Sequence, residues 1–113
     1  MRIYKIFRAP EWAALERDGT TAGAPVDLAD GFIHFSTAAQ AAETAAKHFA
    51  GAGALVLAAV ETDALGDALR WEPSRGGQLF PHLYRALARD EVARHWPLPP
   101  GPDGAHIFPE EMT

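Results

Sequence analysis

Two strings centred on histidine, Asp-Gly-Phe-Ile-His-Phe-Ser-Thr and Phe-Pro-His-Leu-Tyr, contain the residue types in this chain that could do chemistry. Each histidine lies among apolar residues that predict a β-strand, and the side chains of a strand alternate between its two faces. His34 and Ser36 therefore share one face, and Phe80, His82 and Tyr84 share another. An imidazole beside a hydroxyl, repeated in a second strand, could form a polar site on a sheet. The alternative is two buried or edge histidines that each pair with a backbone carbonyl.

A helix is predicted directly after the first string, because Thr37 followed by Gln40 has the capping-box pattern. Ser36, Thr37 and the first amides of that helix could form a seat for an anion, since helix N-termini attract negative charge. The alternative is a helix start that only caps itself.

Glu72, next to Trp71, is the candidate carboxylate for general acid or base work. The alternative for Glu72 is an ordinary surface carboxylate, since charged residues are mostly exposed. The alternative for Trp71 is a core residue that does not stack on a ligand. His34, His82 and Glu72 together could form a two-histidine, one-carboxylate metal centre. The chain lacks the close His-x-x-x-His spacing of such sites, so we expect no bound metal. It also lacks the Gly-x-Ser-x-Gly turn of serine hydrolases and the phosphate-binding glycine loops.

The composition predicts one globular domain over residues 1–113, with a proline-rich segment at 97–113. A net charge of -5 argues against broad contact with nucleic-acid phosphates, which needs a basic face. The absence of cysteine rules out disulfides, thiolate metal sites and cysteine nucleophiles. The first residues do not resemble a signal peptide, and the longest apolar run, residues 52–60, is too short for a membrane span. We therefore expect a cytoplasmic protein that does not bind membranes.

The remaining pattern predicts short strands interspersed with a few helices. Strands are expected at residues 3–7, 32–35, 54–60 and 80–88, with short extended pieces at 70–72 and 105–108. The run at 54–60 is almost continuously apolar, as expected of a central strand buried on both faces. Helices are expected at residues 10–17, 37–49 and 90–95, with one or two helical turns at 62–69 and a loop at 19–29. This order favours an α+β fold with a mostly antiparallel or mixed sheet and two or three helices.

Taken in order, these strings resemble the bacterial family named domain of unknown function 952. The resemblance extends to about Val92 and rests on four motifs, which are Ile3 to Ile6 with Trp12, Asp30 to Thr37 with Gln40, Trp71-Glu72, and Phe80 to Tyr84. The family's fold is similar to that of the ADP-ribosyltransferases, which bind NAD in a cleft of a small split, mostly antiparallel sheet. The resemblance therefore implies that His34 orients the nicotinamide ribose, with Ser36 nearby. It assigns no role to His82 or Tyr84, and no glutamate of this chain stands at the superfamily's late-strand catalytic position.

The leading hypothesis is a protein that binds NAD or a related ADP-ribose ligand in a His-lined cleft, or turns it over slowly. His34 would hold a ribose hydroxyl, Trp71 or Tyr84 would stack on a ring, and Glu72 would be the acid or base. The other expected ligand-binding residues are Ser36, Thr37 and Phe80. NAD would be a substrate in this hypothesis, and no resident cofactor is expected.

Two further hypotheses remain open. In a two-histidine phosphoesterase, His34 and His82 would act as base and acid on a 2′,3′-cyclic phosphate, since histidine serves either role near neutral pH. In a ligand-binding or regulatory module the same cleft would have no catalysis, which the missing late glutamate favours.

Overall fold

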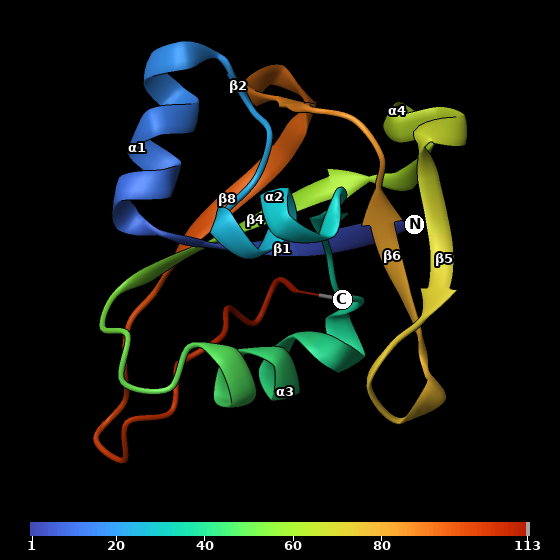
Figure 1. Cartoon of the computed structure of the whole chain (residues 1–113). Coiled ribbons are helices and arrows are strands. Elements are labelled where there is room, and N and C mark those ends of the chain that lie inside the picture. The colour runs from blue at the N-terminus through green and yellow to red at the C-terminus, as the bar shows by residue number, and fades with distance from the viewer. Residues whose placement is uncertain (113) are drawn as a thin grey trace.

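Eight strands, four α-helical segments and three 3-10 turns make up the computed structural model, which describes residues 1–112 apart from the side chain of Arg75 (Figure 1). The strands are β1 (Arg2–Arg8), β2 (Thr20–Thr21), β3 (Ile33–His34), β4 (Leu55–Glu61), β5 (Leu69–Pro73), β6 (Leu79–Leu83), β7 (Leu87–Ala88) and β8 (Val92–Leu98). The helices are α1 (Ala9–Asp18), α2 (Pro25–Asp30), α3 (Ala38–His48) and α4 (Thr62–Leu65), and the 3-10 turns are Gly66–Ala68, Arg75–Gly77 and Arg89–Glu91.

The central sheet has the strand order β1-β4-β8, and both of its pairings are antiparallel. β4 is the middle strand, and its residues from Leu57 to Val60 have no exposed surface. An apolar strand buried on both faces must pair along both edges to satisfy its backbone groups. The predicted central strand is therefore confirmed, and so are the α+β class and the mostly antiparallel pairing.

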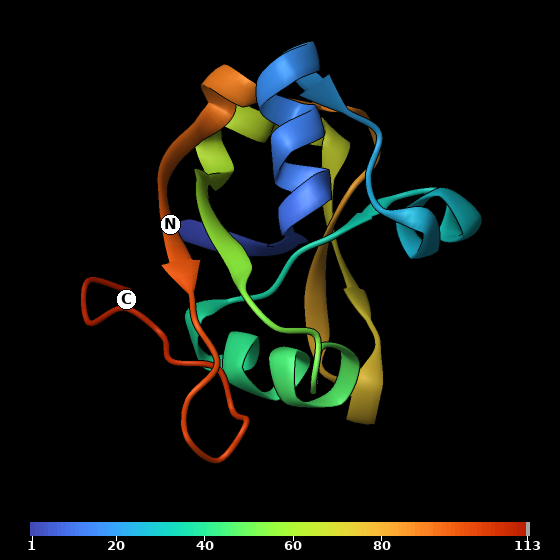
Figure 2. The ribbon, with the colours of Figure 1, turned by 90° about the vertical axis from the view of Figure 1, so that its left-hand side faces the viewer.

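Helices α1 and α3 lie on opposite sides of this sheet (Figure 2). The alternation of side chains along β1 explains the two layers. Phe7 packs edge-on against Trp12 of α1, with ring centroids 5.4 Å apart, whereas Tyr4 belongs to the cluster that contains Ala45 of α3. The small alanine side chain lets the helix backbone approach the sheet closely. Both faces of β1 are therefore anchored, and this anchoring positions the polar residues between them.

The β3-β6-β5 ladder is a second antiparallel sheet, which touches the edge of β1 near its start. The Tyr4 N–H donates to the Ser36 carbonyl at 2.7 Å, and the Tyr4 carbonyl accepts from the Ser36 N–H at 2.8 Å. After this bridge β1 continues to Arg8 as an edge strand, while the chain beyond Ser36 turns into α3. The two sheets therefore diverge, and space for a cavity opens between them.

The described residues contain four α-helical segments, where we expected two or three helices. The predicted loop at 19–29 contains α2, which begins at Pro25 and is capped by Asp27 through a 2.8 Å bond from the Ala24 N–H. Proline suits a first helical turn, but six residues are too few to show the apolar periodicity on which helix prediction depends. The predicted turns after residue 62 are confirmed as α4 and the 3-10 turn that follows it.

The predicted helix at 90–95 is wrong, because a 3-10 turn at Arg89–Glu91 leads directly into β8. Val92 and Trp96 of β8 are buried against β4, and this long-range pairing overrides the local capping signal. The second histidine strand is divided into β6 and β7, and the predicted strand at 105–108 is reduced to a bridge between Pro100 and His106. No helix within residues 1–112 is long and apolar enough to cross a membrane.

Candidate functional site

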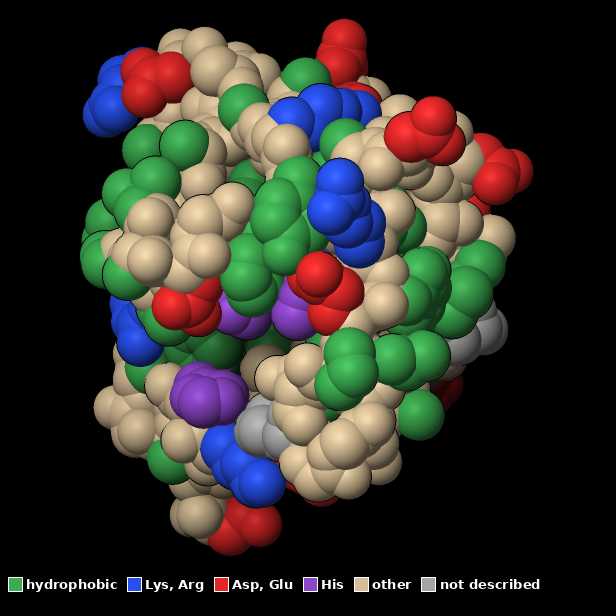
Figure 3. Space-filling view, turned by 45° about the vertical axis from the view of Figure 1, so that its right-hand side comes forward, with side chains coloured by type: hydrophobic (Ala, Val, Ile, Leu, Met, Phe, Trp, Pro, Cys, Tyr) green, Lys and Arg blue, Asp and Glu red, His purple; other side chains and the backbone are tan. Residues whose placement is uncertain are grey.

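A cavity of about 670 Å³ lies between the diverging sheets and is bordered by α2 and α3. Figure 3 shows a hollow in this face of the molecule where histidine side chains gather, with acidic side chains beside them. The polar side chains that argue for a function are Lys5, Arg8, Asp27, His34, Ser36 and His82, all of which line the cavity. They come from four separate segments of the chain, so the tertiary structure brings them together.

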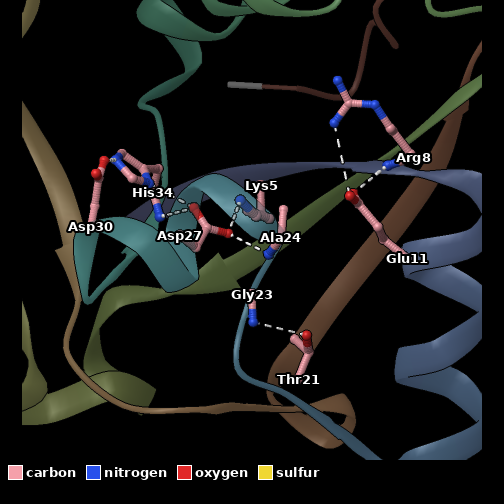
Figure 4. A network of polar contacts seen from close by, with 9 residues as sticks. All are labelled: Lys5, Arg8, Glu11, Thr21, Gly23, Ala24, Asp27, Asp30 and His34. Carbon is pink, nitrogen blue, oxygen red and sulfur yellow. Dashed lines mark hydrogen bonds and ion pairs between the residues drawn. The ribbon is translucent and has the colours of Figure 1, made fainter.

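Asp27 is the centre of a polar cluster at one end of this cavity (Figure 4). Its side chain is 1 % exposed, and it accepts bonds from Lys5 Nζ at 2.8 Å, the Ala24 N–H at 2.8 Å and the His34 N–H at 3.2 Å. His34 Nδ1 lies 2.6 Å from Asp27 Oδ1. An ionised carboxylate can only accept, so Nδ1 of His34 carries the hydrogen. Asp27 therefore fixes the orientation of the His34 ring.

The charge of Asp27 is stabilised by these partners in spite of its burial. Burial alone would raise the pKa of the Asp27 carboxyl, but the hydrogen bond from His34 and the charge of Lys5 outweigh it and lower the pKa from 3.8 to about 2. Lys5 is itself only 6 % exposed. A buried carboxylate paired with a buried ammonium is the arrangement that avoids the high cost of an isolated internal charge.

Asp30, the last residue of α2, approaches His34 from the other side. Its Oδ2 lies 3.0 Å from His34 Nε2, and its side chain is 47 % exposed. Both ring nitrogens of His34 therefore face carboxylates, one buried and one at the surface. Gly31 follows Asp30 with a φ of 86°, a left-handed conformation that suits glycine and turns the chain directly from α2 into the histidine strand.

His82 forms a second histidine–carboxylate pair, on β6. Its Nδ1 lies 2.8 Å from Glu72 Oε1, and the Tyr84 hydroxyl donates to the same oxygen at 2.7 Å. The bond from Tyr84, followed by that from His82, lowers the pKa of Glu72 below its ordinary value, and the contact with Glu72 raises the pKa of Tyr84. Glu72 therefore stays ionised at neutral pH and holds the imidazole of His82 in one orientation.

The two imidazoles are neighbours because β3 pairs with β6 in a register that sets His34 opposite His82. Their ring centroids are 5.4 Å apart and the rings are nearly perpendicular. The ring of Phe32 packs on both, with centroid distances of 4.6 Å to His34 and 4.1 Å to His82. The result is a rigid pair of imidazoles, each with its Nδ1 held by a carboxylate.

A cationic group lies at another part of the cavity wall. The guanidinium of Arg8 stacks over the ring of Phe49 at 4.7 Å, and its Nη1 is 3.8 Å from Glu11 Oε2. Glu11 Oε1 also accepts the Arg8 N–H at 2.9 Å and thereby caps α1. The stacking on Phe49 and the ion pair with Glu11 hold the Arg8 side chain at the cavity, where it can attract an anion.

The structure brings together only some of the residues that the sequence singled out. His34, Ser36, Phe80 and His82 line the cavity, and Ser36 Oγ lies 3.0 Å from Thr44 Oγ1.

Four others lie elsewhere. Thr37 caps α3, since its Oγ1 accepts the Gln40 N–H at 3.3 Å. Glu72 stands behind His82, Trp71 is 39 % exposed on β5, and Tyr84 lines a smaller cavity of about 260 Å³. The hydroxyl of Thr37, which was one part of the possible anion seat at the start of α3, is therefore engaged in the helix's own cap.

The sequence patterns did not point to Lys5, Asp27, Asp30 or Arg8 as site residues. A signal was present for the first two, since a lysine inside an apolar strand needs a buried partner and an acid shortly after Pro25 suits a helix start. Nothing in the sequence indicated that these two would meet. Within residues 1–112 no three His, Asp or Glu side chains converge as a metal site.

Comparison with known proteins identifies solved structures that align with most of this chain. The family model described as protein of unknown function (DUF952) matches residues 6–95. The crystal structure of protein CC0527 from Caulobacter crescentus is similar, with 52% sequence identity, a TM-score of 0.91 and coverage of 95% of this chain and 94% of that one. Its solution NMR structure has 54% identity and a TM-score of 0.82, covering 91% and 89%. No curated protein matches the chain.

Proposed function

Because this chain belongs to the DUF952 family of proteins of unknown function, we propose a function from its geometry: the cavity binds a nucleotide-type ligand of the NAD or ADP-ribose class. The observation that carries the proposal is that His34, Ser36 and His82 line one cavity of about 670 Å³. That volume falls within the range of about 300–1,000 Å³ common for small-molecule sites.

Each part of the ligand has a group of matching chemistry in the wall. The imidazoles of His34 and His82 and the hydroxyl of Ser36 would take the hydroxyls of a ribose. The guanidinium of Arg8, held over Phe49, would attract a phosphate, since planar guanidinium groups bind phosphates with two donors. Phe80 lines the cavity and would stack on a ring, the role that we expected of Trp71 or Tyr84.

The ADP-ribosyltransferase-like fold is part of the same proposal. Two antiparallel sheets that diverge from the Tyr4–Ser36 bridge, with His34 at the split, support it. Glu72 does not line the cavity, so in this proposal it positions His82 and does not touch the ligand itself. We therefore propose ligand binding, and any turnover of the ligand would depend on the imidazoles of His34 and His82.

A thermal-shift titration with NAD, NADP, ADP-ribose and nicotinamide tests binding. A hundredfold excess over the dissociation constant adds about 2.7 kcal/mol of stability, which for a chain of this length raises the melting temperature by roughly 10 °C. Ser36→Ala should reduce the shift with ADP-ribose, whereas Trp71→Ala, outside the cavity, should leave it unchanged. Flat profiles with all four compounds at millimolar concentration would reject the proposal.

The second candidate function is acid–base cleavage of a 2′,3′-cyclic phosphate. The observation in its favour is the 5.4 Å separation of the two imidazole centroids, with each Nδ1 held by a carboxylate. Incubation with a cyclic nucleotide should then yield a single phosphomonoester, and His34→Asn and His82→Asn should each abolish the reaction. Binding without any product over long incubation would favour a ligand-binding module instead.

A further inference from the structure

Ile6 presents a free pair of backbone groups to the cavity. In an antiparallel ladder, residues alternate between those that exchange backbone bonds with the neighbouring strand and those whose N–H and C=O point away from it. Tyr4 directs both of its groups to Ser36, so it belongs to the second kind. The Thr62 N–H donates to the Met1 carbonyl, which fits the same alternation. The N–H and C=O of Ile6 therefore point away from β4, into the space between the sheets.

These two groups lack a protein partner within the described part of the chain. Ile6 is 5 % exposed and lines the cavity, so its backbone groups have limited access to bulk water. Backbone groups that are buried are almost always paired, and an unpaired one costs as much as a lost hydrogen bond. A donor and an acceptor side by side in a cavity wall are thus a ready recognition element.

Between Tyr4 and Arg8, Ile6 is the one residue on the edge of β1 whose outward-pointing backbone groups are unpaired. Tyr4 is bridged to Ser36 on one side of Ile6, and on the other side the Arg8 N–H is bonded to Glu11 Oε1. An added peptide strand would need a run of free groups along the edge, because its own groups alternate in the same way. One donor and one acceptor match a single planar group of a small ligand instead.

We propose that the N–H and C=O of Ile6 form a specificity site for a planar ligand group with a hydrogen-bond acceptor next to an N–H donor. A primary carboxamide and the edge of a nucleobase both have that chemistry. This inference rests on the proposed function, because it assigns an orientation to the ligand that we propose for the cavity. The amide or base edge lies along β1 at Ile6, and an anionic group reaches Arg8, two residues further along the strand.

Titrations followed by ¹⁵N–¹H NMR test the site on the intact chain. Nicotinamide supplies a carboxamide, uridine supplies a nucleobase edge, and methyl nicotinate keeps the ring and the acceptor but lacks the donor. We expect nicotinamide or uridine to shift the Ile6 amide resonance downfield. Methyl nicotinate should bind roughly two- to tenfold more weakly than nicotinamide, the effect of one hydrogen bond.

An amide-to-ester exchange tests the premise without changing a side chain. An ester between Lys5 and Ile6 removes the Ile6 N–H, which has no protein partner, and weakens only the Lys5 carbonyl as an acceptor, so we expect a small loss in melting temperature. The matched exchange between Tyr4 and Lys5 removes an N–H directed toward β4 and should lower the melting temperature clearly. Equal losses in the two esters would overturn the proposal.

The outcomes separate this site from the proposed function. A shift of the Ile6 resonance with nicotinamide or uridine, but no binding of NAD or ADP-ribose, supports the site and rejects the proposed function. Binding of ADP-ribose or NAD that leaves the Ile6 resonance unmoved, or equal affinity for nicotinamide and methyl nicotinate, supports the function and rejects the site. Absence of binding by every probe at 10 mM rejects both.

Discussion

Replacement of Asp27 by asparagine should destabilise this protein more than any single change at an exposed charge. The carboxylate is 1 % exposed and accepts four hydrogen bonds, from Lys5, Ala24 and two nitrogens of His34. An asparagine has one acceptor oxygen, and in either orientation its amide nitrogen would face two of the four donors. It would also leave the ammonium of Lys5, 6 % exposed, without a countercharge.

The expected loss in free energy of unfolding is about 3–5 kcal/mol, the usual effect of removing one partner from a buried ion pair. Total stabilities of small domains are about 5–15 kcal/mol, so a loss of this size removes a large fraction of the stability of the chain. Urea denaturation followed by circular dichroism measures the loss. Asp18→Asn is the matched control, because Asp18 pairs with Arg17 at the surface and its loss should cost less than about 1 kcal/mol.

The acid limb of the stability profile gives an independent measure of the same carboxylate. The pKa of Asp27 is lowered from 3.8 to about 2 on folding, so the unfolded chain takes up the proton first as the pH falls. The ionised carboxyl of Asp27 therefore contributes roughly 2 kcal/mol to the free energy of unfolding. This contribution is present above about pH 4 and is lost as the pH falls through about 2. Asp27→Asn should flatten the profile in this window. A loss under about 1 kcal/mol with an unchanged acid limb would refute the buried-pair reasoning.

Three further outcomes are expected. His34→Ala should abolish ADP-ribose binding, measured by calorimetry. It should lower the free energy of unfolding in urea by only about 1–2 kcal/mol, because Asp27 keeps its bonds from Lys5 and Ala24. A variant that fails to fold would contradict this expectation. Asp30→Asn should tighten ADP-ribose binding severalfold, because it removes a competing carboxylate 3.0 Å from His34 Nε2, and weaker binding would argue against that competition. Thr37→Ala should lower stability by about 1 kcal/mol through loss of the α3 cap, with the affinity for ADP-ribose unchanged. A changed affinity would show that Thr37 contributes to ligand binding.

Local patterns in the sequence were sufficient to predict several elements of this fold. The capping box at Thr37 and the apolar run of β4 each depend on residues close together in the chain, and both are present. The division of side chains between two faces of a strand is equally local. It correctly grouped Phe80 with His82 in the cavity, although Tyr84 two residues further on lies outside it.

The two incorrect predictions of secondary structure, the helix at 90–95 and the loop that contains α2, have the same physical origin. Both elements depend on contacts between residues that are distant in the sequence. The helix predicted after residue 89 became β8 because pairing with β4 buries Val92 and Trp96, an energy that no local window contains. The short helix α2 was overlooked for a related reason. Its stability depends on Asp27, which binds a strand residue more than twenty positions earlier in the chain.

The sequence alone therefore determined the family, the α+β class and most of the histidine-bearing segments, because these depend on residue types and short-range spacing. Only the tertiary structure decided which of those residues meet. The register of β3 against β6 sets His34 opposite His82, the bridge at Tyr4 separates the sheets, and burial pairs Lys5 with Asp27. Each of these depends on how strands pair and what they bury, and strand pairing is a property of the whole chain.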